Sequence, residues 1–400
     1  MNERRRTRRQ VLGATGAALG AMGLSGCAGG SAGDSERSTA ASTASADSTA
    51  TATTGPTDGP DTGGTATAYE VEMAPVGTIT LDGVPGRVAH YFPGYADMAV
   101  ALGHGDSIVS TGVTSRYHTD VYDELDGVSV DTSGMTELVG DSGIDTELFY
   151  ELDSDLHLID PRWLTNNSFF GLEEADVEEL TERVAPFLGN VIFRRTDPWH
   201  DYRYYTMYEA FEKVAAVYQE RDRFEAFAAL HDEYIAEVQS KLPAEEERPN
   251  ALLTFSSSDE PEAFFPYRVS DRGTNKKQFH DLGITDALAG TGIDGLSTDD
   301  RGQIDYEAML AVDPDSILVR GHETRTEAEF EDTVVAFMRD HPVASELTAV
   351  QEGRVFRGGP IYTGPIHNLF LTERFAKDYF PDVFSGDLFD RGRVSEIVGG

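Results

Sequence analysis

The chain has 400 residues, 40% hydrophobic and 26% charged, which is typical of a folded protein long enough for two domains. Its 70 acidic residues outnumber 32 basic ones and give a formal net charge of -38 at pH 7. Such a surface repels a phosphate backbone, which excludes nucleic acid as a partner. Acidic residues spread through every segment predict a halophilic source, because concentrated salt screens their mutual repulsion.

Residues 1–27 predict an export signal that ends in a lipid-modified cysteine. A basic stretch precedes a short apolar run, Val11 to Leu24, which is too short to span a bilayer as a mature helix. Thr7-Arg8-Arg9-Gln10-Val11-Leu12 resembles the twin-arginine export motif, and Leu24-Ser25-Gly26-Cys27 resembles a lipobox. Because Cys27 is the only cysteine, no intrachain disulfide can form. The alternative is an ordinary cleaved signal with an incidental cysteine.

Residues 28–70 predict a flexible tether between this anchor and the folded body. Up to residue 68 the segment consists mostly of Ser, Thr, Ala, Gly, Asp and Pro and has no aromatic residue. A segment of this composition cannot bury enough apolar surface to fold.

Beyond the tether, expected strands alternate with expected helices, which predicts mainly parallel sheets with helices on their faces. In such sheets, ligands bind beyond the carboxyl ends of the strands. We assign residues 71–203 to a first lobe and 243–400 to a second. The expected strands include residues 79–81, 107–110, 156–160, 190–193 and 251–255, and a further strand follows the aspartates within residues 312–319. The expected helices include residues 95–103, 148–152, 172–184, 277–288, 304–310, 330–339 and 369–379.

Residues 204–242 form the expected connector, whose main part is a long helix from Arg221 to Leu242. Apolar residues recur there at helical spacing, no Gly or Pro interrupts the segment, and Pro243 ends it. At 1.5 Å per residue this helix is about 33 Å long, enough to join two lobes. The alternative is one more packed helix in a single large α/β domain.

The two lobes share a repeated unit. LFYELDSDLHLI, beginning at Leu148, is similar to MLAVDPDSILV, beginning at Met309. Each stretch predicts a helix, then aspartates, then a strand, so two lobes of the same design are expected.

Three further motifs give the chain a resemblance to a known family. They are Pro85-x-Arg87-Val88, the stretch Ala101-Leu102-Gly103-x-Gly105-Asp106-x-Ile108-Val109, and Ala349-Val350-x-x-Gly353-Arg354-Val355. Their order and spacing resemble class III solute-binding proteins, the extracellular components of ABC importers for ferric siderophores, haem and cobalamin. Ser154 departs from that family, which usually has Pro there. The resemblance implies an α/β fold of two Rossmann-like lobes, each with a mainly parallel sheet, joined by one long helix.

The implied function is capture of an iron(III)-siderophore-type chelate in the interlobe cleft and delivery to the permease and ATPase subunits. Cobalamin or haem is the alternative ligand. The protein is then a monomer on the extracellular face of the membrane, with no cofactor and no catalytic residue. Two functions of a different kind stay open, a secreted, lipid-anchored α/β enzyme and a ligand-sensing surface protein. The enzyme is less favoured because the one GxSxG string, Gly29 to Gly33, lies in the expected tether and not between a strand and a helix, and no HExxH or GxxxxGK[ST] string occurs.

Aromatic and arginine side chains in the loops at strand ends are the candidate ligand contacts. Aromatic rings give rigid contact area to a bulky chelate, and arginine pairs with carboxylate or catecholate oxygens. The main candidates are Arg116, Tyr117, Trp163, Arg268 and Tyr362. The wider set is Tyr91, Tyr95, Trp199, Tyr267 and His367, of which some are expected to pack within a lobe instead. No metal site is expected, because the histidines are scattered with no pair at i, i+4.

The resemblance also implies that each lobe presents an acidic residue to arginines of the permease. Asp97 and Asp281 occupy the matching positions, and ordinary solvated acids are the alternative. Because a helical connector is stiffer than paired strands, we expect small lobe movements on binding.

Overall fold

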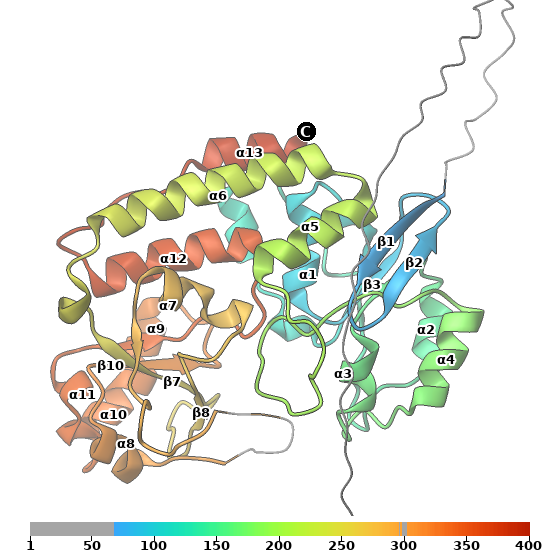
Figure 1. Cartoon of the computed structure of the whole chain (residues 1–400). Helices are drawn as coiled ribbons and strands as arrows, with labels where there is room; N and C mark the ends of the chain where they lie inside the picture. The colour runs from blue at the N-terminus through green and yellow to red at the C-terminus, as the bar shows by residue number, and fades with distance from the viewer. Residues whose placement is uncertain (1–67, 296, 298–301) are drawn as a thin grey trace, which may run out of the picture. The chain divides into compact units, whose positions relative to one another are not determined.

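The computed structural model describes residues 68–295, 297 and 302–400, which lie in one compact unit (Figure 1). The predicted export signal with Cys27, and the tether up to residue 67, lie outside the described residues. Among the helices of the described part, none has the length and apolar character needed to cross a membrane.

The first lobe contains a four-stranded parallel sheet. Its strand order is β5 (Thr136–Glu137), β4 (Ile108–Thr111), β3 (Val88–His90) and β6 (Leu156–Leu158). An antiparallel hairpin of β1 (Tyr69–Met73) and β2 (Gly77–Leu81) precedes it. The helices are α1 (Pro93–Ala101), α2 (Glu147–Leu152), α3 (Pro161–Thr165) and α4 (Glu174–Arg183).

The second lobe contains a five-stranded sheet in which only β8 is antiparallel to its neighbour. The order is β11 (Val355–Arg357), β10 (Ser316–Arg320), β7 (Asn250–Phe255) and β8 (Phe265–Tyr267), with β9 (Thr285–Asp286) also on β7. The helices are α7 (Lys277–Asp281), α8 (Tyr306–Val312), α9 (Glu327–Phe330), α10 (Ala336–Asp340), α11 (Thr348–Gln351), α12 (Pro365–Tyr379) and α13 (Arg391–Gly399). The predicted fold of two lobes with mainly parallel sheets is confirmed.

The repeated unit has the same conformation in both lobes. Helices α2 and α8 end at Asp153 and Asp313, which adopt left-handed φ angles of 47° and 44°. Two residues later, Asp155 and Asp315 accept backbone N–H groups at the start of the neighbouring strand, β3 or β7, at 2.8 and 2.9 Å. In each lobe the second aspartate therefore fixes how two parallel strands enter the sheet.

Helix α6 (Arg221–Lys241) ends one residue before the predicted boundary, and α5 (Met207–Tyr218) precedes it. It packs against α5 and α13 and lies across the top of the view in Figure 1. Helix α6 is not the only element that joins the two lobes, because α12 of the second lobe packs against α1 of the first lobe as well as against α7.

One hydrophobic core continues through both lobes. It includes Met98 of α1, Phe227 of α6 and Phe375 of α12. A second, smaller core around Ile317 and Met338 is confined to the second lobe. A shared core resists separation of the lobes, which supports the expectation of small lobe movements.

Two predicted elements were wrong. Residues Asn190–Phe193 form no strand, because the N–H of Val191 donates to the Asp160 carboxylate (2.9 Å) instead of a neighbouring strand. The helix expected to reach residue 288 ends at Asp281, because Gly283 adopts a φ of 67° and the chain turns into β9.

The prediction that Asp97 docks on the permease is also wrong, because this residue is wholly buried. Its Oδ2 accepts the backbone N–H groups of Ile366 (2.8 Å) and His367 (3.2 Å) in the first turn of α12. Its Oδ1 accepts the hydroxyl of Tyr122 at 2.7 Å. A carboxylate of the first lobe thus caps a helix of the second.

The His367 ring completes this buried network. Its Nδ1 lies 3.0 Å from Oδ1 of Asp97, and its Nε2 lies 2.6 Å from the carbonyl oxygen of His118. The Nδ1 contact is an ion pair without hydrogen-bond geometry, but both nitrogens lie beside acceptors, which favours the protonated ring. Burial lowers the pKa of His367, but the Asp97 carboxylate and the His118 carbonyl outweigh burial and leave the pKa raised.

Asp97→Asn should destabilise the protein by about 3 kcal/mol, because it leaves a buried imidazolium without its counter-ion. Urea unfolding in concentrated salt measures the change. Asp106→Asn, at an exposed position after α1, is the matched control and should change the free energy of unfolding by less than about 0.5 kcal/mol. Equal effects of the two variants would contradict the capping role.

The contribution of His367 to the stability of the protein should fall as pH rises above about 6.5, the pKa of an unperturbed histidine. The folded pKa of His367 is raised, so its contribution is complete below the unfolded pKa and is lost as pH rises through the folded pKa. The difference in free energy of unfolding between the wild-type protein and His367→Asn, measured across this pH range, should therefore shrink as pH rises. A difference that does not change with pH would show that the ionisation of His367 does not stabilise the fold.

Candidate ligand-binding cleft

A cavity of about 370 Å³ lies between the carboxyl ends of the two sheets. This volume lies within the range of small-molecule sites. Nine of its sixteen wall residues are aromatic. The first lobe contributes Tyr91, Val113, Arg116, Val139, Trp163, Asn167, Phe169, Phe170, Phe193 and Arg194. The second contributes Phe255, Phe265, Tyr267, Ser297, Ile361 and Tyr362.

The parallel sheets explain why these residues converge. Tyr91 directly follows β3, Arg116 lies in the loop after β4, and Trp163 lies on α3 after β6. In the second lobe, Phe255 ends β7 and Tyr362 follows β11. Carboxyl ends of parallel strands share one edge of a sheet, so both edges face the same space.

The aromatic wall is continuous across the two lobes. Trp163 packs edge-on against Tyr91 and Phe193, with ring centroids 5.8 and 5.6 Å apart. Phe193 in turn lies 5.0 Å from Tyr362 of the second lobe, at an interplanar angle of 78°. Phe169 stands at the rim and is 52% exposed. This arrangement offers several fixed ring faces and edges to one bulky ligand.

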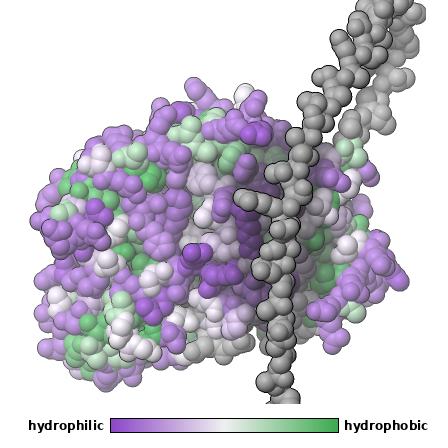
Figure 2. Space-filling view, viewed as in Figure 1, coloured by the Kyte–Doolittle hydropathy of each residue, from purple (hydrophilic) through white to green (hydrophobic). Residues whose placement is uncertain are grey.

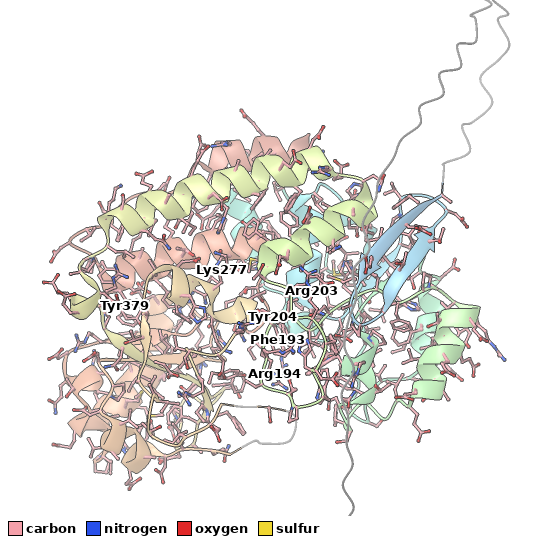
Figure 3. The ribbon with its side chains drawn as sticks, in the orientation of Figure 1. Phe193, Arg194, Arg203, Tyr204, Lys277 and Tyr379 are labelled. Carbon is pink, nitrogen blue, oxygen red and sulfur yellow. The ribbon has the colours of Figure 1, made fainter. Side chains whose placement is uncertain are left out.

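Two arginines belong to the wall. Arg194 pairs in bidentate fashion with Asp197 at 2.7 and 2.9 Å, and its guanidinium lies 5.2 Å from the Phe193 ring centroid. Figure 3 shows Phe193 and Arg194 close together in the loop between α4 and α5. Arg116 is exposed and makes no ion pair with any residue that the structure describes.

A second space of about 270 Å³ adjoins the first and shares Arg116, Phe255 and Ile361 with it. It adds Glu323, whose Oε2 lies 3.5 Å from Arg374. The cleft therefore extends from an aromatic chamber into a more polar one.

Half of the predicted ligand-contact residues lie in the cavity wall. They are Arg116, Trp163 and Tyr362 of the main candidates and Tyr91 and Tyr267 of the wider set. Their contact with a ligand stays a prediction.

The other five predicted contacts are corrected, because their side chains are engaged outside the wall. The hydroxyl of Tyr117 lies 3.1 Å from that of Tyr122, and His367 belongs to the Asp97 network. Tyr95 is wholly buried, and its hydroxyl donates to the Asn190 carbonyl at 2.9 Å.

Arg268 and Trp199 are the remaining two. Arg268 is partly exposed and pairs with Asp286 at 2.7 Å, outside the cavity wall. Trp199 stacks on His200 with ring centroids 5.8 Å apart and lies behind Trp163.

Much of the wall escapes prediction from the sequence. Phe193 and Arg194 are missed because the segment that ends at Phe193 has the composition of a strand. Phe169 and Phe170 follow Trp163 closely in an expected loop, and an apolar pair in such a loop is the signal that could have identified them. Within the described ranges, no three His, Cys, Asp or Glu side chains are grouped to hold a metal ion.

Two parallel-sheet lobes, a long connecting helix and an aromatic cleft at the strand ends define the class III solute-binding fold. The family described as periplasmic binding protein matches residues 88–362. The chain therefore belongs to the periplasmic binding protein family.

Solved structures share this fold at low sequence identity. The petrobactin-binding protein YclQ from Bacillus subtilis is 13% identical, over 80% of this chain and 99% of that one, with a TM-score of 0.53. PiuA, an iron uptake ABC transporter substrate-binding protein from Streptococcus pneumoniae, is 16% identical over 78% and 98%, with a TM-score of 0.52. The haem-binding protein HmuT is 16% identical over 80% and 92%, with a TM-score of 0.51. No curated protein matches the chain by sequence.

Proposed function

We propose that this protein is the extracellular solute-binding component of an ABC importer and binds an iron(III)-siderophore-type chelate in the interlobe cleft. The observation that carries the proposal is the cavity wall, in which nine of sixteen residues are aromatic. Rigid rings suit the large, partly apolar surface of a chelate, and arginine at the same wall suits its oxygen donors. The proposed role is binding and delivery, without bond chemistry.

The family and two of the similar structures support this class of ligand. YclQ is a petrobactin-binding protein and PiuA belongs to an iron uptake transporter. HmuT has the same fold and binds haem, so haem is the second candidate, with cobalamin behind it. A lipid-anchored α/β enzyme is the alternative of a different class.

We further propose that the protein is exported by the twin-arginine route and anchored through lipidated Cys27. The basic start, the short apolar run and the lipobox-like stretch before the only cysteine support this placement. The acidic composition supports a halophilic source.

A ferric siderophore should quench tryptophan fluorescence in concentrated salt. The chain has two tryptophans, so each single variant keeps one as the reporter. Trp163→Phe should weaken affinity roughly fivefold or more, because Trp163 lines the cavity. Trp199→Phe is the control and should change affinity by less than about twofold. If ferric siderophores, haem and cobalamin all leave the signal unchanged, the proposed function is wrong.

Docking to the permease requires exposed acids, and the repeated unit supplies one on each lobe. Glu147 of α2 and Glu307 of α8 each lie six residues before the left-handed aspartate of their unit, and both are exposed. Asp281 is less suited, because its Oδ2 lies 2.6 Å from Nζ of Lys277.

An exposed apolar residue follows each of these glutamates by three positions. They are Tyr150, 44% exposed, and Leu310, 38% exposed. Elsewhere the visible face is mostly hydrophilic, with hydrophobic patches scattered over it (Figure 2). An acid beside an apolar side chain, repeated on two lobes, suits a partner that presents arginine twice.

The pair Glu147→Gln and Glu307→Gln should abolish chelate uptake into cells while leaving ligand affinity unchanged. These substitutions remove the negative charge beside Tyr150 and beside Leu310, but neither glutamate lines the cleft. A second double variant, Glu178→Gln with Glu346→Gln, removes two exposed acids elsewhere and should keep uptake. Normal uptake by the first double variant would place docking at other residues, with Asp281 next to be tested.

A further inference from the structure

The aromatic chamber of the cleft has basic side chains in its wall, although the chain as a whole is acidic. Its wall includes Arg116 and Arg194 and, among the described residues, no aspartate or glutamate. Acidic residues outnumber basic ones by 70 to 32 in the whole sequence. The wall of this chamber therefore differs in charge from the rest of the protein, although Asp197 pairs with Arg194 and Glu323 lines the adjoining space.

Behind the wall lies a buried arginine. Arg320 ends β10 and has no exposed surface, and its guanidinium carbon lies 5.0 Å from the ring centroid of Tyr267, which lines the cleft. It donates to the carbonyl oxygens of Asn275 and Gly358. Its Nη1 is buried without a partner, and no described carboxylate lies within ion-pair distance. The acid that acts on it electrostatically is Glu323, whose carboxylate lies 3.5 Å from Arg374.

Lys276 adds a further buried cation, with 1% of its surface exposed. Burial lowers its pKa to about 7, and Arg320 and Arg194 lower it too. Asp271 and Asp286 oppose this effect, but Asp286 pairs with Arg268, and neither forms an ion pair with Lys276. The pKa of Asp271 is itself raised, chiefly by burial.

A cation in a protein interior is costly unless an anion pairs with it. The field of a buried charge is also less screened by salt than that of an exposed one. Arg320 and Lys276 have no ion-pair partner among the described residues. Arg320 lies against Tyr267 of the wall, and Lys276 interacts electrostatically with Arg320 and with Arg194 of the wall. Among the spaces lined by described residues, the cleft is the one bordered by Arg116, Arg194 and Tyr267, the ring that Arg320 contacts.

We propose that the ligand is anionic and that its negative group completes the cation cluster, defined as Arg116, Arg194, Lys276 and Arg320. This inference rests on the proposed function and narrows its ligand class. Chelates with catecholate or carboxylate oxygens and a net negative charge fit the cluster. Neutral hydroxamate chelates do not supply the missing counter-ion.

Two ferric chelates of different charge test this directly. Ferric enterobactin is a triply negative tris-catecholate, and ferrioxamine E is a neutral tris-hydroxamate. Fluorescence titration in concentrated salt should show at least tenfold tighter binding of the anionic chelate, as expected for charge-assisted hydrogen bonds. Equal or tighter binding of the neutral chelate overturns the inference and leaves the proposed function standing. Failure of both chelates to bind removes the proposed function as well.

Arg116→Gln should weaken binding of the anionic chelate about tenfold and that of the neutral chelate less than threefold. Arg116 is exposed, so its replacement is compatible with folding. Arg183→Gln removes the same charge from α4, where the side chain pairs with Glu179 away from the cleft, and should leave both affinities unchanged. Equal losses for both chelates in Arg116→Gln would contradict a charge-specific role.

The pH dependence gives a second readout. An anionic ligand favours the protonated form of Lys276, so affinity for ferric enterobactin should fall as pH rises through about 7. Lys276→Met keeps the volume and should make the affinity independent of pH in this range, with thermal unfolding confirming the fold. Ferrioxamine E should show little pH dependence with either protein. A slope for enterobactin that survives in Lys276→Met would exclude Lys276 from the cluster.

Discussion

The buried Asp97 carboxylate connects the two lobes at the point on which the cleft depends. It caps α12 from α1, and α12 follows directly on the segment that places Tyr362 in the wall. Tyr362 then meets Phe193 of the first lobe at 5.0 Å. Separating the lobes would break the buried contact between Asp97 and His367 and would expose the shared hydrophobic core. Both changes are unfavourable, so the aromatic wall is largely formed before a ligand binds.

The sequence could predict helix α6, but it could not predict that α12 also connects the two lobes. Amphipathic spacing, an uninterrupted run and Pro243 are local signals, and they located α6 to within one residue. The role of α12 depends on a contact between Asp97 and His367, 270 residues apart. Nothing in the spacing around Asp97 indicates which helix it caps. Its position in a family motif suggested a surface role, which burial excludes.

In the candidate site too, local sequence signals identified some residues, whereas contacts between distant segments decide the position of others. Arg116 and Trp163 were predictable because each follows a strand whose carboxyl end had been located, and Tyr362 because it lies in the segment after the family motif that ends at Val355. Tyr95 also follows a strand, but it lies on α1 and turns its ring into the core. The direction of a side chain depends on helix phase and on neighbours from other segments, and neither is fixed by order along the chain. Phe193 and Arg194 lay in a segment whose strand-like composition concealed an irregular loop.

The acidic surface and the cationic cleft are compatible because they act at different ranges. At low salt a chain of net charge -38 would repel an anionic chelate well before contact. In the concentrated salt that the composition predicts, the screening length falls to about 3 Å at 1 M, so this repulsion vanishes beyond direct contact. A ligand entering the cleft then responds to the nearby guanidinium of Arg116 and to the buried charges of Arg320 and Lys276, which salt screens least. A strongly acidic protein can in this way select a ligand of its own sign.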